Sequence, residues 1–590
     1  MTRLPPLLLL TACTEYAVIA ADVSVGDDTG PRVHGLPPPG GSAWTPTPEC
    51  AGVDAAPEGP SATATCDVVG FAAWDLKVEW EASSLGGAFP MVLPNPAGHS
   101  DVADFRVANG FLFLDGAGGV QRAWFPTRAH GGTNPVAYAR LPTGDAIATW
   151  KEPGSAGADM TRWWSAADGS VVSSVPAGDL GGIVRWLDID RDGSPETVGH
   201  NLSVAADGAT IAQVEGSVSY DTAMTANGDF NRDGRIEIAS THGIWDALTG
   251  GLTPWNGLSE HTFQAAPVLL NGEVAFLGTD GQAAFRANPD GEVVWRLALP
   301  ENDQGIAVGD VDGDGVPEMA VNTTGEIVLL DANGTQRWSV PSRPVEAGAV
   351  VMADLDADGA YEVIAYGNTG LRILAGADGT VLADDPTIYN GNAYGSPAIA
   401  DIDGDGSADI VVVGQRREDA VWVVRAYGAA EGRWARTRPV WNELDYDVTT
   451  VQDDGKLAVW PIASWESYNS FRAQPAHDGP HPDLTVVATD LCCDSDTVYL
   501  AVQPSNLGSV DALAAATITL STNDGTGWRA VASKVLADGI GAQRSLAGLV
   551  FEIPRSDWGN LQVIQITGAD GDECDFVNDR VQVQLECPEP

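Results

Sequence analysis

The 590-residue chain has few basic residues, few cysteines and no long apolar run. Its 31 Lys and Arg face 81 Asp and Glu, which gives a formal net charge of −50. Because binding to nucleic acid or anionic lipid needs clustered Lys and Arg, this balance excludes both as expected partners. No apolar run beyond the N-terminus reaches the roughly 18–20 residues that a membrane-spanning helix needs.

Common signatures of catalytic centres are also missing. The eight His residues are scattered, and the sequence contains neither His-Glu-x-x-His nor Gly-x-Ser-x-Gly. The first motif would hold a catalytic zinc ion, and the second would present a nucleophilic serine. Arg-Gly-Asp is absent too, so nothing indicates an integrin ligand.

The N-terminus has the pattern of an export signal. A basic residue, the apolar run Leu4–Leu10 and small residues before Cys13 fit such a signal. Leu10-Thr-Ala-Cys13 resembles the bacterial lipoprotein box, which predicts lipidation of Cys13; an ordinary signal with an incidental cysteine is the alternative. We expect an exported outer-membrane or cell-surface lipoprotein that meets the membrane only through its lipid anchor. Residues 14–70, rich in Pro and Gly, predict a flexible tether.

The remaining cysteines suit an exported protein. Six are left once Cys13 is set aside: Cys50, Cys66, Cys492, Cys493, Cys574 and Cys587. An even number in an exported chain indicates disulfides. The first two are expected to pair locally and the other four among themselves, with their pairing left open. A zinc site competes with this interpretation, but no Cys-x-x-Cys supports it.

One acidic pattern occurs five times. Carboxylates or an amide stand at positions 1, 3, 5 and 9 of each nine-residue loop, with glycine at position 6. The candidate ligands are Asp188, Asp190, Asp192 and Glu196 in loop 1; Asp229, Asn231, Asp233 and Glu237 in loop 2; Asp310, Asp312, Asp314 and Glu318 in loop 3; Asp354, Asp356, Asp358 and Glu362 in loop 4; and Asp401, Asp403, Asp405 and Asp409 in loop 5. This spacing gathers the oxygen ligands that calcium prefers.

Other interpretations of the loops are weaker. An EF-hand needs a Glu at position 12 and flanking helices, whereas the flanks here are rich in β-forming residues. Acidic turns without metal would place three or four carboxylates together with no counter-charge. A catalytic ion keeps an open coordination position and acid–base neighbours, which the sequence does not supply. We therefore expect calcium ions that stabilise the fold.

The loops recur at the period of a repeat protein. They start at 188, 229, 310, 354 and 401, and the double interval of 81 residues predicts a unit near residue 270 that has lost its loop. Each unit contains four short apolar runs, as in 306–309, 319–321, 326–330 and 335–340, which is typical of a β-propeller blade. Weaker units at 104–124 and 136–178 bring the total to about eight blades, with seven as the alternative. The run 76–81 is predicted to complete the last blade.

The stretch Ile306-Ala-Val-Gly-Asp-Val-Asp-Gly-Asp-Gly-Val-Pro-Glu-Met-Ala-Val321 resembles the FG-GAP (VCBS-type) repeat of integrin α-subunit propellers and bacterial surface proteins. The resemblance implies a propeller over 71–440 with calcium in the hairpin between the first two strands of a blade. It also implies a backbone carbonyl ligand at position 7, from Ser194, Arg235, Val316, Ala360 and Ser407.

The C-terminal quarter differs from the repeats. Residues 441–480 are rich in aromatics such as Trp441 and Trp465, which predict either packing between domains or a sugar-stacking surface. Residues 481–590 contain about seven short apolar runs, typical of an immunoglobulin-like β-sandwich, and Pro482-Asp-Leu-Thr-Val resembles the CARDB-type adhesion module. The fold class is thus all-β, a propeller followed by a sandwich.

Two functions fit these features. The first is a calcium-binding adhesion or recognition scaffold for an extracellular protein or glycan. The second is a polysaccharide lyase or hydrolase, which would need carboxylates, Lys, Arg or Tyr converging in the central channel outside the loops. The sequence shows no such group and does not indicate an oligomeric state.

Overall fold

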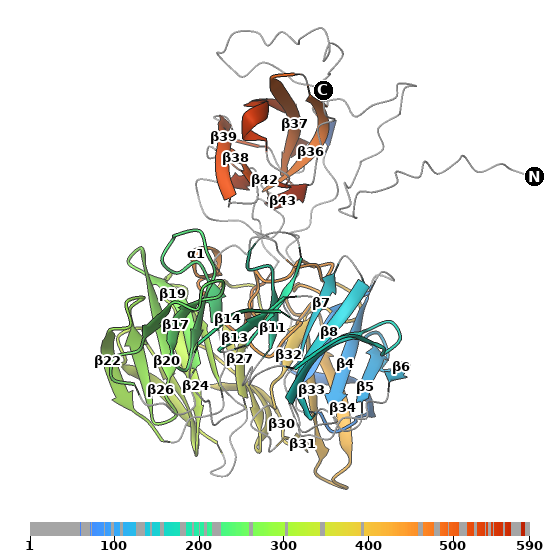
Figure 1. Cartoon of the computed structure of the whole chain (residues 1–590). Coiled ribbons are helices and arrows are strands. Elements are labelled where there is room, and N and C mark those ends of the chain that lie inside the picture. The colour runs from blue at the N-terminus through green and yellow to red at the C-terminus, as the bar shows by residue number, and fades with distance from the viewer. Residues whose placement is uncertain are drawn as a thin grey trace, which may run out of the picture. The chain divides into compact units, whose positions relative to one another are not determined.

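The computed structural model describes residues 59–60 and most of 71–476 and 484–583 (Figure 1). The stretches outside the description are 1–58, 61–70, 477–483, 584–590 and internal breaks, the longer ones being 126–135, 177–183, 215–225 and 568–579. Within the described residues the chain is nearly all β, with one four-residue helix, α1 (Ser464–Ser467), and one 3₁₀ turn, η1 (Arg555–Asp557). Contacts divide it into unit A (67–479) and unit B (1–66 with 480–590).

The described part of unit A contains eight small sheets in chain order, antiparallel apart from one short parallel pair. Sheet 1 is β3 (Pro90–Pro94), β4 (Ser100–Arg106), β5 (Gly110–Asp115) and β6 (Gln121–Phe125). Sheet 2 is β7 (Val136–Leu141), β8 (Gly144–Pro153), β9 (Asp159–Ser165) and β10 (Val171–Pro176). Sheet 3 is β11 (Arg185–Leu187), β12 (Glu196–Val198), β13 (Leu202–Val204) and β14 (Thr210–Gln213). Sheet 4 is β15 (Ala226–Gly228), β16 (Glu237–Ser240), β17 (Gly243–Asp246) and β18 (Leu252–Pro254).

The other four sheets follow the same order. Sheet 5 is β19 (Gln264–Leu270), β20 (Glu273–Thr279), β21 (Ala283–Ala287) and β22 (Val293–Ala298). Sheet 6 is β23 (Ile306–Gly309), β24 (Glu318–Thr323), β25 (Glu326–Leu330) and β26 (Gln336–Pro341). Sheet 7 is β27 (Ala349–Ala353), β28 (Glu362–Gly367), β29 (Gly370–Leu374) and β30 (Val381–Asp385), joined by β35 (Ala473–Gln474). Sheet 8 combines β31 (Ile388–Tyr389), β32 (Ala398–Ala400), β33 (Asp409–Arg416) and β34 (Trp422–Ala429) with β2 (Leu76–Ser83).

Burial falls from the first strand of a sheet to the fourth. In sheet 6, all four residues of β23 and all six of β24 are buried, whereas most of β26 is exposed or half-buried. The sequence explains this gradient, because the first strands are continuous apolar runs and the fourth strands alternate apolar with polar residues. The fourth strand is therefore the exposed edge of sheets 1 to 7, and β2 takes that place in sheet 8.

Each sheet packs on the next one along the chain. Shared apolar clusters join sheet 1 to sheet 2, sheet 2 to sheet 3, sheet 3 to sheet 4, sheets 4 and 5 to sheet 6, and sheet 6 to sheet 7. One further cluster joins sheets 7 and 8 to Val92, Val102 and Leu112 of sheet 1. The last sheet thus packs on the first.

The predicted repeats are found as sheets. The strand predicted at 306–309 is β23, and the loopless unit near residue 270 is sheet 5, where only Asn271 and Gly272 join β19 to β20. The run 76–81 lies in β2, which pairs antiparallel with β34 as predicted, so that Leu76 faces Ala429. This pairing removes an open edge from sheet 8.

A segment that follows the sheets, residues 434–474, contacts the first strand of every sheet; we call it the return segment. Its contacts to sheets 1, 2, 5, 6, 7 and 8 are Trp441 N–H to Val92 O, Tyr138 N–H to Asn442 O, Leu269 N–H to Asn469 Oδ1, Val308 N–H to Phe471 O, Met352 N–H to Arg472 O and Gln474 Nε2–H to Ile399 O. Its contacts to sheets 3 and 4 are Arg185 Nη2–H to Asp445 O and the Trp465 ring against Gly228.

The return segment includes most of the region predicted as an aromatic transition. Trp441 and Trp465 are 0% and 1% exposed, because they pack inside unit A against these first strands. They offer no exposed face for stacking on a sugar ring, which corrects the sugar-platform alternative. The structure places the described part of this region within unit A.

Unit B contains two sheets around one apolar core. One sheet is β1 (Gly59–Pro60), β40 (Arg544–Ser545), β37 (Thr497–Asn506), β36 (Leu484–Cys493) and β41 (Leu549–Pro554); the other is β39 (Trp528–Leu536), β38 (Ala516–Asn523), β42 (Leu561–Thr567) and β43 (Arg580–Val583). Their apolar faces meet in a single cluster. Part of the predicted tether is therefore structured, since β1 pairs with β40.

Several predictions fall outside the described residues. They concern Cys13 and the export signal, Cys50, Cys66, Cys574 and Cys587. Cys492 and Cys493 lie at the end of β36, and the disulfide pairing stays a prediction. None of the described helices is long and apolar enough to cross a membrane.

Candidate metal sites

The five acidic loops occupy equivalent places in five sheets. Each joins the first strand to the second, in sheets 3, 4, 6, 7 and 8. The first strand ends directly before position 1 of the loop, and the second begins at position 9. The backbone hydrogen bonds between these two strands therefore fix both ends of each loop. The carboxylates project from a short connection between two buried strands.

Two positions of each described loop have left-handed backbone. At position 6, Gly234, Gly315, Gly359 and Gly406 have φ between 80° and 87°. At position 4, loops 3 and 5 have Gly313 and Gly404, while loops 2 and 4 hold Arg232 and Ala357 at φ of 60° and 59°. A side chain in this conformation costs about 1 kcal/mol or more relative to glycine. Loops 2 and 4 keep the same turn in spite of this strain, so the turn is a property of the nine-residue motif.

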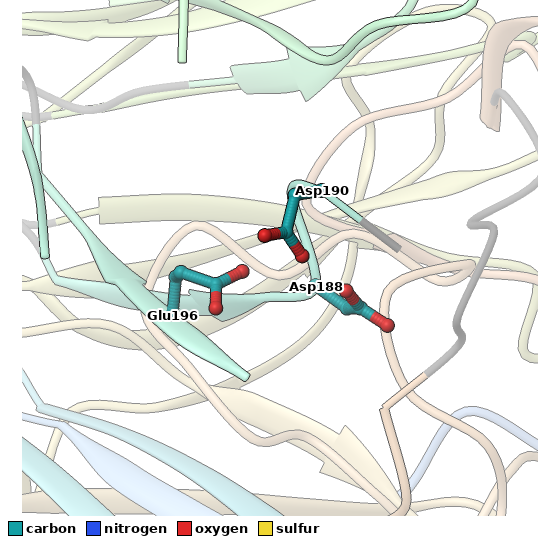
Figure 2. A group of neighbouring side chains, drawn as sticks. All are labelled: Asp188, Asp190 and Glu196. Atoms are coloured by element: carbon teal, nitrogen blue, oxygen red, sulfur yellow. The ribbon is translucent and has the colours of Figure 1, made fainter. Parts of the chain in front are cut away.

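The turn brings carboxylates from the two ends of each loop together. Three side chains per loop offer ligand oxygens within 4.8 Å of one another, and Figure 2 shows the three of loop 1. The groups are Asp188, Asp190 and Glu196; Asp229, Asp233 and Glu237; Asp310, Asp312 and Glu318; Asp354, Asp356 and Glu362; and Asp401, Asp403 and Asp409. Loop 2 uses position 5, because position 3 is Asn231.

The other predicted ligands differ in their placement. Asp192 lies outside the described residues. Asp314, Asp358 and Asp405 at position 5 are not in the three-membered groups; each accepts a hydrogen bond from the backbone N–H of position 7, at 2.8–2.9 Å. Asn231 donates through Nδ2 to Glu237 Oε1 at 3.2 Å. An amide that donates to a ligand carboxylate competes with a cation there, so we expect loop 2 to be a weaker site than the all-carboxylate loops.

Hydrogen bonds hold one oxygen of the end carboxylates in place. In all five loops the position 9 carboxylate accepts a bond from the backbone N–H of position 2, at 2.9–3.2 Å. In loops 2 to 5 the position 1 carboxylate accepts one from the glycine at position 6, at 2.6–3.1 Å. The second oxygen of the position 1 carboxylate differs between loops: in loops 2, 3 and 5 it accepts further backbone N–H bonds, whereas Asp354 Oδ1 of loop 4 accepts none. Orienting ligands in this way prepares a site for a cation.

Loop 4 shows a direct need for a ligand. Asp354 Oδ1 and Asp356 Oδ1 are buried and have no hydrogen-bond partner. A buried, unpaired carboxylate oxygen is costly unless a cation or a proton compensates it. Asp354, Asp356 and Glu362 lie in one group, and their carboxylates are the hard oxygen ligands that calcium prefers. The residues present therefore fit a divalent ion such as calcium.

Burial and mutual repulsion raise the pKa of several loop carboxylates. Desolvation is the largest cause, and the neighbouring Asp residues add to it. The pKa is raised to about 8 for Glu237, about 7 for Glu318, about 7 for Asp354, about 9 for Glu362 and about 6 for Asp401. Desolvation also raises the pKa of Asp409 well above its ordinary value. Without metal, several of these groups therefore hold protons near neutral pH.

We expect calcium affinity to fall as the pH is lowered from 8 to 6. A dication binds the deprotonated carboxylates, so it must displace the protons that these raised pKa values retain. The metal-free protein should show the opposite trend, because the folded state holds protons that the unfolded chain releases above pH 4.5; its stability therefore falls as the pH rises. Calorimetric titration at pH 6, 7 and 8 in two buffers with different ionisation enthalpies would measure affinity and proton release. Equal affinity at pH 6 and 8 would contradict the expectation.

A second charged group was not predicted from the sequence. Arg185 of β11 lies 3.5 Å from Glu443 Oε1 and 3.7 Å from Asp445 Oδ2, and all three side chains are 0% exposed. Arg185 also donates to Asn227 Oδ1 of sheet 4. Arginine and carboxylates thus converge inside unit A, as the enzyme alternative requires, but a substrate reaches them only if the return segment moves.

Known proteins are similar to this chain in one short stretch of sequence and in fold. The FG-GAP-like repeat family model matches residues 354–412, which contain loops 4 and 5. No curated protein matches the chain. The biofilm matrix protein Bap1 of V. cholerae aligns over 69% of this chain and 99% of its own, with 14% identity and a TM-score of 0.53. That likeness shows a shared fold.

Two other solved structures align less well. BBS1N, crystallised in complex with ARL6DN, covers 62% of this chain and 97% of its own at 10% identity and a TM-score of 0.34. A eukaryotic initiation factor covers 65% of this chain and 90% of its own at 10% identity and a TM-score of 0.31. Neither score is high enough to carry an argument about this chain.

Proposed function

We propose that this protein is an exported, calcium-stabilised β-propeller that acts as an adhesion or recognition scaffold outside the cell. The observation that carries the proposal is the recurrence of one carboxylate group at the same place in five of eight sheets. A catalytic centre is built once per chain, whereas a feature repeated at the period of the fold serves the fold.

The packing order supports a propeller with eight blades. Each sheet packs on its neighbour in sequence, and the apolar cluster that joins sheets 7 and 8 to sheet 1 closes the series. The pairing of β2 with β34 supplies the closing strand that such a ring needs. Eight sheets favour the eight-bladed interpretation over the seven-bladed one. The two sheets of unit B fit the immunoglobulin-like, CARDB-type module.

Calcium is the ion that fits the loops best. Every group consists of carboxylates, and no described His or Cys joins any of them. Zinc favours nitrogen and sulfur ligands, and magnesium keeps most of its water and needs few protein ligands. Calcium takes six to eight oxygens, which the side chains and the position 7 carbonyl can supply. An ion in each loop would tie the first strand of a sheet to its second.

An extracellular role is consistent with the comparisons. The N-terminal lipoprotein-type signal predicts export, and Bap1, whose fold this chain shares, is a biofilm matrix protein. Calcium at the roughly millimolar levels found outside cells would fill sites of the affinity usual for extracellular modules. We infer that the partner is an extracellular protein or glycan, contacted by loops that the sheets hold in place.

The test is calcium-dependent binding without turnover. Full-length protein is incubated with intact bacterial cells and with purified exopolysaccharides, in about 1 mM calcium and in chelator. We expect saturable retention that chelation abolishes, with no change in polymer length. New reducing ends or unsaturated sugars would favour the polysaccharide-cleaving alternative. Equal retention with and without calcium would contradict the calcium-stabilised scaffold.

A further inference from the structure

One arginine occupies part of loop 3. Arg337, on the fourth strand β26 of sheet 6, contacts Asp312 Oδ2 through Nη2 and lies 3.3 Å from Glu318 Oε1 through Nη1. These carboxylates stand at positions 3 and 9 of the loop and belong to its candidate metal ligands. A single guanidinium therefore bridges two of the three ligands.

The bridge leaves the position 9 carboxylate of loop 3 fully hydrogen-bonded. Glu318 Oε2 accepts a bond from Val311 N–H at 3.2 Å, and Oε1 accepts one from Arg337. In loop 4, by contrast, Asp354 Oδ1 and Asp356 Oδ1 have no partner. A cation entering loop 4 meets vacant oxygens, whereas one entering loop 3 must displace or share a charge-assisted hydrogen bond.

The reach of Arg337 follows from the register of its strand. Leu330 pairs with Gln336 and Leu329 with Trp338, so Arg337 is the extra residue of a β-bulge. The equivalent bulge residue of β30, in the sheet that holds loop 4, is Leu382, since Leu374 pairs with Val381 and Ile373 with Ala383. Ile211 in sheet 3 and Arg122 in sheet 1 are also residues of equivalent bulges. Sheet 1 has no acidic loop.

Arg122 shows that this bulge aims a side chain at the start of the second strand. Its Nη1 lies 2.6 Å from Asp101 Oδ1, near the start of β4. The same register therefore places an arginine on an acidic residue in two different sheets. An apolar bulge residue, as in sheet 7, leaves the loop carboxylates without this counter-charge.

We propose that Arg337 is a built-in competitor for the calcium ion of loop 3. In the metal-free state its guanidinium neutralises Asp312 and Glu318, and calcium binding displaces it. Loop 3 is then the weaker partner of loop 4, although both carry four carboxylates, and it fills only at higher calcium concentration. The inference rests on the proposed calcium binding and assigns an order to the sites.

The experiment is a calcium titration of chelator-treated full-length protein by calorimetry at constant ionic strength. Arg337→Gln is expected to tighten one site about tenfold, which is the effect of removing a competing interaction of roughly 1.4 kcal/mol. The converse variant Leu382→Arg, which places an arginine at the equivalent bulge of sheet 7, is expected to weaken one site by a similar factor. Arg122→Gln is the matched control at the same register and should change no calcium affinity.

The outcomes distinguish a failure of calcium binding from a failure of the competition by Arg337. If the unchanged protein binds no calcium, the proposed function fails. If it binds calcium but Arg337→Gln weakens a site or leaves all sites unchanged, Arg337 is not a competitor and the inference is overturned. Should Arg337→Gln fail to fold, Leu382→Arg alone decides, because unchanged or tighter binding in that variant would refute the competition.

Discussion

Chelation of calcium is expected to lower the melting temperature of unit A by about 8 °C and to leave unit B nearly unchanged. A site at tenfold excess of calcium over its dissociation constant stabilises the folded state by about 1.4 kcal/mol, and five such sites by about 7 kcal/mol. Unit A spans residues 67–479, and at about 2.1 cal/mol/K of unfolding entropy per residue each kcal/mol moves its melting temperature by roughly 1.2 °C. All five loops lie in unit A, between residues 188 and 409, so only its transition should respond.

Calorimetry with and without chelator, combined with limited proteolysis, measures this effect. New cleavage sites should appear in 180–440 before they appear in 481–590. A single-loop variant, Asp354→Asn, is a graded control: it removes one carboxylate of loop 4 and should reproduce about a fifth of the chelator effect. If chelation leaves both transitions unchanged, or shifts both equally, calcium does not stabilise unit A.

Replacing Arg185 with Met is expected to destabilise unit A by about 3–5 kcal/mol, because breaking a buried ion pair leaves uncompensated charge. Arg185 is the basic partner of Glu443, whose two carboxylate oxygens have no hydrogen-bond partner. Desolvation already raises the pKa of Glu443 to about 8, and Arg185 opposes that rise. Without Arg185 the pKa of Glu443 rises further, so the loss should grow as the pH rises toward 8, where the unchanged protein begins to release this proton and the variant does not.

The unfolding transition of unit A at pH 6 and pH 8 measures this loss. The double variant Arg185→Met with Glu443→Gln should recover a large part of it, because no unpaired charge then remains at Glu443. Arg232→Met is a matched control on loop 2: its ion pair with Glu466 is exposed, and such pairs contribute about 0–1 kcal/mol. A loss for Arg185→Met no larger than for Arg232→Met would show that the buried group is not needed for stability.

Local pattern was enough to predict the repeats and the loops. The apolar run Ile306–Gly309 and the glycine at position 6 are properties of neighbouring residues; the run forms a strand, and the glycines of loops 2 to 5 form the turn. The weaker strands were harder. Strand β3 escaped prediction because prolines begin and end it, and β39 because its exposed edge position gives an irregular apolar pattern.

Contacts between distant residues could not be predicted in this way. Arg185 contacts Glu443 only because the return segment crosses back over sheet 3. The sequence near either residue contains no pattern that indicates this contact. Arg337 reaches loop 3 because a β-bulge turns its side chain, and a bulge leaves no clear signature in one sequence. Asp314 at position 5 accepts a hydrogen bond from Val316 N–H, and its role as a metal ligand stays a prediction.

The return segment also sets an order on how unit A can be made. Synthesis delivers the chain from its N-terminus, so the eight sheets emerge before Gln474, the last described residue that holds them together. Strand β2 likewise waits unpaired until β34 arrives. Until then the first strands lack their shared neighbour, and a chain cut short before residue 434 would expose apolar surface to proteases and chaperones. Folding of unit A is thus completed at the end of its delivery, and a truncated product is marked for removal.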